Sequence, residues 1–263
     1  VDYPDADDTW DDFAQKARDV ADLDDEVYGV CFPATFDRFG AFAFGTGWNT
    51  FDDAGSSDLL DARFEEAVTW YTGLIADEAA VQPSDIGAGW TGDCLATDNV
   101  GIAIEGAWIL GFLRDVAPNL QFGTAPMPLG PSGERGNLLF TVAWGVNANS
   151  ENQEEALAVL ELLVSEKVQQ FVLENGLALP SREALAENAY FEAGTPEAEA
   201  NKVVFDGGSD GNVIGFQFGS VGTDWMQPVN EALSAVMTGQ SDVSEALSAA
   251  QEQLVALLER AGN

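Results

Sequence analysis

An excess of acidic residues is the feature that most restricts what this chain can fold into and bind. The sequence holds 45 Asp and Glu residues against 10 Lys and Arg, which gives a net charge of −35, and it contains no His. Nucleic acids and anionic membranes are bound through Lys and Arg, so we expect neither as a partner. Without His, the chain lacks the commonest general base and the commonest metal ligand.

The acidic residues do not indicate disorder, because disordered acidic chains are poor in aromatic residues. Apolar residues make up 46% of the sequence, which includes 7 Trp and 16 Phe. A chain of 263 residues therefore has enough apolar material for a core, in one large or two modest domains. Repulsion among so many carboxylates is tolerable in concentrated salt, since molar salt shortens the Debye length to about 3 Å. We expect a halophilic source, with an ordinary acidic protein as the alternative.

The two cysteines, Cys31 and Cys94, lack the spacing of a metal site. They either form one disulfide or remain two buried free thiols, and we favour the free thiols. The sequence has no run of about 18 apolar residues that would predict a membrane span. Residues 1–5 lack the charged and apolar regions of a signal peptide, so none is expected in this chain.

Periodicity and caps predict a few short strands separated by helices, which is the pattern of an α/β protein. Thr9 with Asp12, and Ser150 with Gln153, are predicted to cap helices. Helices are expected over residues 10–21, 58–77, 152–163, 167–174, 223–237 and 242–260, with another from near residue 107 and a short one from near residue 182. Strands are expected over residues 28–32, 101–104, 122–125 and 138–146, and loops over 33–48 and 206–215.

Two cofactor-like motifs are incomplete. Gly45-Thr46-Gly47-Trp48 begins like a dinucleotide-binding loop, but the third glycine is missing and no clear strand precedes it. The stretch from residue 206 begins like a calcium loop, but Gln217 stands where the loop requires Glu, so we expect a plain turn. We therefore expect no cofactor, no metal and no catalytic residue. Carboxylate pairs at glycosidase spacing carry little information among 45 acidic residues.

The informative aromatic residues lie at the boundaries of the expected elements. Trp108 follows a strand at the start of a helix, Trp225 begins another helix after Phe216-Gln217-Phe218, and Trp144 lies in a strand. In α/β sheets, ligands bind outside the carboxyl ends of the strands. An indole face packs well against the C–H face of a sugar ring, while polar groups at its rim bond the hydroxyls. Core packing is the alternative for each Trp, since Trp is highly buried on average.

Six segments follow one another in an order that covers nearly the whole chain. They are Pro4 to Phe13 with Thr9-Trp10, Ile102 to Trp108, Pro126 to Gly133, Trp144 to Ala156, Gly176 to Arg182 with one extra residue, and Met237 to Asp242. This order resembles the extracellular solute-binding proteins of ABC importers, in the branch that includes maltose-binding protein. The chain is similar to roughly the last two-thirds of a family member. The family's leader, lipid-anchor cysteine and most of its first lobe have no counterpart here.

The resemblance implies an α/β, type II periplasmic-binding-protein-like fold with two lobes, of which the first is incomplete. Residues 1–135 would form the second, C-terminal lobe, residues 136–187 elements of the first lobe, and residues 188–263 mostly the second lobe. The implied function is to bind a small organic solute, a sugar or sugar derivative, between the lobes and deliver it to the membrane permease of an ABC transporter. Such a protein is extracellular or periplasmic, membrane-tethered at full length, monomeric and not an enzyme.

The aromatic pattern and the resemblance together give a set of candidate ligand-binding residues. Trp108 is the first candidate for ring stacking, Trp225 the second and Trp144 the third. The other candidates are expected to line the same cleft: Thr35, Phe36, Arg38, Glu105, Phe216 and Gln217. Glu105 would accept hydrogen bonds from hydroxyls. The alternatives are a carbohydrate-active hydrolase that uses paired carboxylates, and an adhesion or structural module that binds no small molecule.

Overall fold

The computed structural model describes residues 1–53, 55–175, 177–216 and 218–262. The motif glycine Gly176 and the candidate site residue Gln217 lie outside the described residues. The chain forms two compact units, which we call unit 1 (Val1–Glu105, Ala125–Leu139 and Gly207–Asn263) and unit 2 (Gly106–Thr124 and Phe140–Asp206). Residues 106–124 and 188–206 thus belong to unit 2, whereas the expected lobe boundaries grouped them with residues 1–105. The match between these units and the family's lobes remains a prediction.

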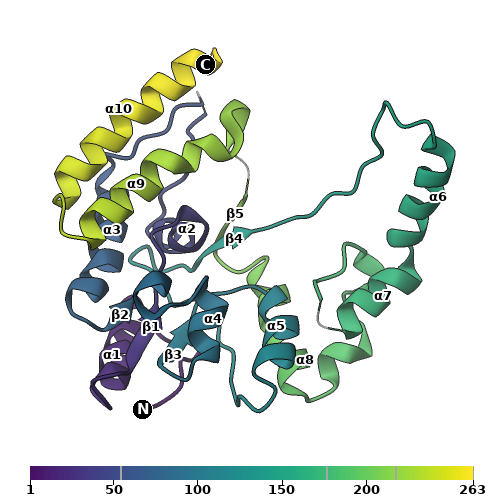
Figure 1. Cartoon of the computed structure of the whole chain (residues 1–263), viewed down its shortest axis with the longest axis horizontal. Helices are drawn as coiled ribbons and strands as arrows, with labels where there is room; N and C mark the ends of the chain where they lie inside the picture. The colour runs from purple at the N-terminus through teal and green to yellow at the C-terminus, as the bar shows by residue number, and fades with distance from the viewer. Residues whose placement is uncertain (54, 176, 217, 263) are drawn as a thin grey trace. The chain divides into compact units, whose positions relative to one another are not determined.

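Unit 1 contains a three-stranded parallel sheet in the order β2-β1-β3 (Figure 1). Its strands are β1 (Tyr28–Cys31), β2 (Ala80–Val81) and β3 (Val100–Ala103). The central strand aligns Val30 with Ala80 on one side and with Ile102 on the other. A second parallel sheet of unit 1 pairs β4 (Gly136–Leu139) with β5 (Asn212–Gly215).

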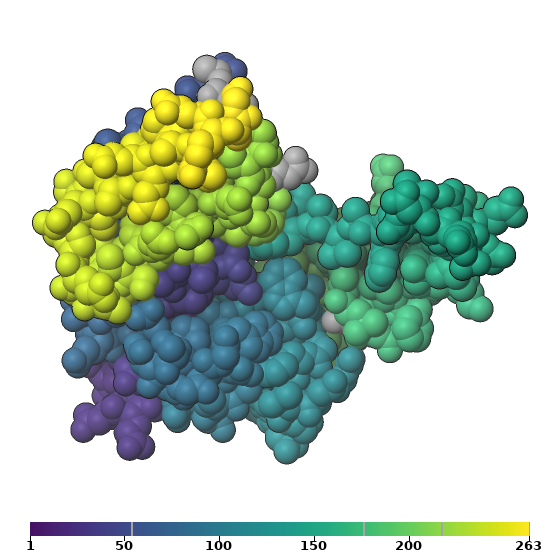
Figure 2. Space-filling model, turned by 45° about the horizontal axis from the view of Figure 1, so that its top comes forward, coloured from purple at the N-terminus to yellow at the C-terminus, as the bar shows by residue number. Residues whose placement is uncertain are grey.

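Helices pack around these sheets in unit 1. They are α1 (Trp10–Ala21), α2 (Phe36–Gly45), α3 (Ala62–Ala76), α4 (Thr91–Ala96), α9 (Met226–Met237) and α10 (Val243–Ala261), with 3₁₀ turns η1 (Pro83–Ile86) and η4 (Gly219–Trp225). α9 and α10 lie side by side and cover one face of unit 1, as Figure 2 shows. The helices expected over 10–21, 58–77, 223–237 and 242–260 are confirmed, with starts that shift by up to four residues.

The expected strands and loops need several corrections. The strands at 28–32 and 101–104 are confirmed, but the strand expected at 138–146 ends at Leu139. Among the described residues, 122–125 form no strand. The loop expected at 33–48 is wrong because α2 occupies most of it, and the loop expected at 206–215 contains β5. α2 buries every residue from Phe39 to Gly45, so beyond its first turn it shows none of the periodicity that marks a surface helix.

The core of unit 1 is aromatic. Phe39 is fully buried and packs edge to face against Phe64 and Tyr71, with ring centroids 5.4 and 5.3 Å apart. Burial of each such ring contributes about 1.5–3 kcal/mol relative to exposure. Gly29 lets α1 approach β1 closely, since a Cβ there would lie 2.0 Å from the carbonyl oxygen of Ala17. Within this core, α1 packs against β1, whereas α2 packs against β4 and α3.

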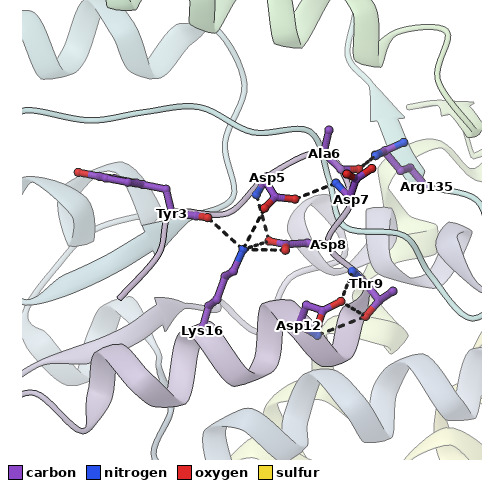
Figure 3. Close-up of polar contacts among 9 residues, drawn as sticks. All are labelled: Tyr3, Asp5, Ala6, Asp7, Asp8, Thr9, Asp12, Lys16 and Arg135. Atoms are coloured by element: carbon purple, nitrogen blue, oxygen red, sulfur yellow. Dashed lines mark hydrogen bonds and ion pairs between the residues drawn. The ribbon is translucent and has the colours of Figure 1, made fainter.

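The acidic N-terminal segment is held to α1 by Lys16 (Figure 3). Its Nζ donates to both carboxylate oxygens of Asp8, at 2.6 and 2.7 Å, and to the carbonyl oxygen of Tyr3 at 3.0 Å. The hydrogen bond to Asp8 raises the pKa of Lys16. The predicted capping box is confirmed, because Thr9 and Asp12 exchange hydrogen bonds at the start of α1.

Unit 2 is helical and buries few of its apolar side chains. It contains α5 (Trp108–Val116), α6 (Gln153–Leu163), α7 (Glu166–Glu174), most of α8 (Pro196–Gly207), and the 3₁₀ turns η2 (Glu183–Leu185) and η3 (Ala189–Glu192). Within the described part of the chain, α6 has no buried residue. The capping box predicted from Ser150 and Gln153 is wrong: Asn152 is the N-cap, without a side-chain capping bond, and Gln153 donates to the carbonyl oxygen of Ala148.

Cys31 and Cys94 form a disulfide, so the free thiols favoured from the sequence are wrong. The two residues are 63 positions apart, and both are fully buried. Their proximity arises only when α4 packs against the end of β1, which the sequence did not predict because it did not indicate α4. None of the helices in the described residues is both long and apolar enough to cross a lipid bilayer.

Candidate functional site

The carboxyl ends of β1 and β3 bring together a group of polar side chains in unit 1. Because the strands are parallel, the segments that follow them leave at the same edge of the sheet. β1 leads through Thr35 into α2, and β3 leads directly to Glu105. We call Thr35, Asp37, Arg38, Thr91 and Glu105 the carboxyl-edge cluster.

A two-pronged ion pair between Arg38 and Glu105 forms the centre of this cluster. Arg38 donates from Nε to Glu105 Oε1 at 3.0 Å, and from Nη2 to Oε1 and Oε2 at 2.9 and 3.0 Å. Thr91, the first residue of α4, donates its hydroxyl to the same Oε1. The Glu105 side chain is 3% exposed and that of Arg38 is 15% exposed. A buried pair with this geometry holds both side chains in one orientation.

Asp37 brings a second carboxylate to the same guanidinium. Its Oδ2 lies 3.3 Å from Arg38 Nη1, which also donates to the Asp37 carbonyl oxygen at 3.2 Å. Asp37 Oδ1 is buried and has no hydrogen-bond partner among the described residues. The cluster therefore contains two carboxylates for one guanidinium.

The turn between β1 and α2 is held by side chains of two other helices. The Phe36 amide donates to Asn230 Oδ1 of α9 at 2.7 Å. The Asn230 side chain, rather than the Thr35 hydroxyl, therefore accepts a hydrogen bond from the start of α2. Tyr71 of α3 donates its hydroxyl to the Pro33 carbonyl oxygen at 3.0 Å. Burial raises the pKa of Tyr71 well above its ordinary value, and the nearby Asp37 charge raises it further. The Thr35 hydroxyl makes no capping hydrogen bond and is half-buried.

The disulfide positions the third partner of the cluster. Cys31 ends β1, and Cys94 lies in α4 one turn after Thr91. The cross-link thus ties the helix that carries Thr91 to the strand that leads to Arg38. Asp37, Thr91 and Asn230 were not predicted as site residues. Asp37 is adjacent to a predicted residue, whereas Thr91 and Asn230 gave no signal, because their contacts span 14 and 194 positions.

The structure brings Thr35, Arg38 and Glu105 together, but it places two other predicted residues in the core. Phe36 and Trp225 are fully buried, with ring centroids 4.8 Å apart. Trp225 also stacks on Phe218 at 5.1 Å. Ring stacking with a solute does not fit this burial, because both faces of each ring contact protein. Phe216 is half-buried against Phe218.

The two remaining predicted residues are exposed on unit 2. Trp108 begins α5, is 40% exposed and meets Phe140 edge to face at 5.4 Å. Its ring lies over Gly106, where a Cβ would come within 2.4 Å of the indole. Trp144 is 62% exposed and lies in a segment without regular secondary structure rather than in the predicted strand. Glycine at 106 is therefore needed for the Trp108 ring to adopt this position.

Two other features of the described residues offer no metal site and no overlap with this cluster. In the residues that the structure describes, no three His, Cys, Asp or Glu side chains gather as metal ligands. A groove between α9 and α10 is lined by five alanines, together with Pro228, Glu231, Ser241, Glu245 and Gln253, and shares no residue with the carboxyl-edge cluster.

Known proteins resemble the chain in sequence over most of its length. Residues 2–170 match the family model described as bacterial extracellular solute-binding protein. Proteins of Brucella abortus and Brucella suis that are named as binding proteins are 26% identical over 190 residues. The match covers 69% of this chain and 46% of each relative, so the chain spans about half the length of these relatives.

Solved structures share the fold. An ABC substrate-binding protein from Listeria monocytogenes in complex with cycloalternan matches with a TM-score of 0.84 at 19% identity, over 98% of this chain and 66% of its own. The GacH receptor of Streptomyces glaucescens matches at 0.78 and 19%, over 97% and 65%. A maltose-bound Thermotoga maritima protein matches at 0.77 and 18%, over 97% and 66%. The chain therefore belongs to the bacterial extracellular solute-binding protein family and has the α/β fold of its maltose-binding-protein-like members.

Proposed function

We propose that the protein containing this chain captures a sugar or sugar derivative outside the cytoplasm and delivers it to the membrane permease of an ABC importer. The observation that carries the proposal is the preorganised carboxyl-edge cluster, in which Glu105 and Thr91 hold Arg38 at the edge where α/β folds bind ligands. Support also comes from the similar structures, whose names include cycloalternan, acarbose and maltose as bound molecules.

The candidate residues take different roles in this proposal. The Thr35 hydroxyl would bond a solute hydroxyl, and Arg38 would border the site in a fixed orientation. Glu105 is a positioning residue, because Arg38 and Thr91 engage its carboxylate. Trp108 is the first candidate for stacking on a sugar ring, and Trp144 the second, because their indoles are exposed. Phe36 and Trp225 would support the edge from the core, and Phe216 remains a candidate beside them.

A hydrolase gains no support from the cluster or from the comparisons. A glycosidase needs one carboxyl that donates a proton and a second that attacks or activates water. Glu105 instead accepts hydrogen bonds from a guanidinium and a hydroxyl, so its carboxylate oxygens are engaged within the protein. The family is one of binding proteins. We therefore propose a monomeric binding protein with no catalytic step.

The decisive experiment is calorimetric titration of the chain in molar KCl with maltose, maltotetraose, tagatose, glycerol and a tripeptide. A sugar should bind, and Trp108→Ala should weaken its affinity about 30- to 1,000-fold, as expected for loss of a stacked aromatic. Val142→Ala is the matched control, since Val142 is 84% exposed on the same unit. Binding of the peptide alone, or unchanged sugar affinity in a folded Trp108→Ala protein, would contradict the proposal or the stacking role, respectively.

A further inference from the structure

We infer that the carboxyl-edge cluster selects uncharged sugars and excludes sugar acids and sugar phosphates. The inference rests on the proposed function, because it names the class of solute for that same site. Arg38 is the cluster's cation, and a free arginine is the side chain best suited to bind a carboxylate or phosphate in two-pronged fashion. In this chain, the carboxylates of Glu105 and Asp37 already bind the Arg38 guanidinium.

The guanidinium nitrogens of Arg38 donate hydrogen bonds to acceptors within the protein. Nε and Nη2 point to Glu105 at 2.9–3.0 Å, and Nη1 points to the Asp37 carbonyl oxygen at 3.2 Å and carboxylate at 3.3 Å. An anionic solute would have to displace Glu105 to reach the guanidinium fork. Displacement would leave a carboxylate that is 3% exposed without its cation, which is strongly unfavourable.

The local charge also opposes an anion. Two carboxylates surround one guanidinium, and the buried Oδ1 of Asp37 has no hydrogen-bond partner among the described residues. The other cations of unit 1 that form ion pairs do so with acids elsewhere: Lys16 with Asp8, Arg18 with Asp77, Arg63 with Asp61 and Arg135 with Asp210. The cluster is therefore net negative and poorly screened by salt, because its central pair is buried.

Three structural features keep this arrangement from rearranging. Thr91 donates to Glu105, the disulfide at Cys94 ties α4 to β1, and the Phe36 amide is bonded to Asn230. A neutral hydroxyl-rich solute needs none of these contacts to break. It can bond the Thr35 hydroxyl and the outer edge of the ion pair without carrying a charge into a negative site. The geometry thus favours an uncharged sugar over its acid by about ten- to a hundredfold in affinity.

The first test uses inorganic phosphate as the probe. Its binding is measured by ³¹P NMR titration at constant ionic strength. The wild-type chain should show no saturable binding. Glu105→Gln should bind phosphate at least about tenfold more tightly, because the Arg38 fork is released and one negative charge is lost. The double variant Arg38→Gln/Glu105→Gln should lose that gain. Glu65→Gln, which removes one exposed carboxylate of α3 outside the cluster, should behave as wild type.

Asp37→Asn covers the case in which Glu105→Gln does not fold, since the Asp37 side chain is 38% exposed. It should give a smaller gain in phosphate binding than Glu105→Gln. Saturable phosphate binding by the wild type, or folded charge-removing variants that gain nothing, would overturn the inference.

The second test compares glucose with glucuronate, which differ by one carboxylate, in calorimetric titrations of the wild type. Weaker binding of glucuronate by tenfold or more supports the inference. Tighter binding of glucuronate would overturn it and leave the proposed sugar-binding function standing. If no sugar of either kind binds while Glu105→Gln still gains phosphate affinity, the proposed function fails and the charge-based exclusion of anions stands.

Discussion

Units 1 and 2 differ in how far they bury their large apolar side chains. In unit 1, aromatic rings from α1, α2, α3 and η4 pack into one cluster, and Phe39, Trp48 and Tyr71 are at most 2% exposed. In unit 2, Leu157, Leu162 and Phe171 on α6 and α7 are 50%, 59% and 58% exposed. The two units therefore depend on different forces, with tertiary packing dominant in unit 1 and local helix signals dominant in unit 2.

This difference predicts different responses to the same substitution. Phe39→Ala, in the core of unit 1, should reduce the free energy of unfolding by about 3–5 kcal/mol through the lost contacts and the cavity. Phe171→Ala, on α7 of unit 2, should change it by at most about 0.5 kcal/mol, since the ring is mostly exposed. Denaturant unfolding followed by circular dichroism measures both. Equal costs would show that unit 2 has a packed core of its own.

Amide hydrogen exchange tests the comparison without substitution. Amides of α6 and α7 should exchange at least about a hundredfold faster than those of β1 and α2, because segments with few buried contacts open locally. Exchange at constant pH and molar KCl, followed by mass spectrometry, resolves the two units. Uniform protection across both would contradict the contrast in packing.

Salt concentration should have the next largest effect on the free energy of unfolding, because the chain carries a net charge of −35. Lowering KCl from molar to millimolar concentration removes the screening of carboxylate repulsion. We expect a loss of about 2 kcal/mol, which corresponds to roughly 4–8 °C in Tm for a chain of this size. Calorimetry should show unit 2 unfolding first at low salt. A Tm that holds or rises on dilution would remove the reason for expecting a halophilic source.

Tyr71 gives unit 1 a specific alkaline sensitivity. Its pKa in the folded chain is raised above the ordinary 10.0, chiefly by burial. The stabilisation is therefore fully present below about pH 10 and is lost as the pH rises towards the folded pKa, because the unfolded chain ionises first. Tyr71→Phe should cost about 1 kcal/mol near neutral pH, from the lost bond to Pro33, and should lose less stability between pH 9 and about 11 than the wild type. If the stability of the wild type and of Tyr71→Phe fell equally with pH, Tyr71 would not be the source of the alkaline sensitivity.

Helix capping should give the smallest effect. Thr9→Ala removes the capping box of α1, which is exposed, and should cost about 0.5 kcal/mol of stability. It should also raise the pKa of Asp12, which the Thr9 hydrogen bonds now lower. Asn152→Ala at the start of α6 is the control in unit 2 and should have almost no effect, because Asn152 makes no side-chain capping bond. Urea melts and a carboxyl NMR titration measure these differences.

The helices that the sequence predicted well are those whose signals are local. α1 begins after the Thr9 cap and buries one face, and α10 begins after Asp242 and repeats its apolar residues at helical spacing. α2 escaped prediction for the opposite reason: every residue after its first turn is buried, so polar and apolar residues do not alternate along it. Local pattern reports a helix only where one side of that helix meets water.

The sequence by itself determined the net charge of −35, the α/β order of elements and the presence of Arg38, Glu105 and Trp108 as candidate site residues. Only the tertiary structure decided which residues meet. Arg38 and Glu105 are 67 positions apart and Cys31 and Cys94 are 63 apart, so no local pattern could pair them. Trp108 and Trp225 show the same limit, since both lie at helix starts but one is 40% exposed and the other fully buried. Whether an indole faces water or a core depends on what packs over it from distant segments, and that is a property of the folded chain.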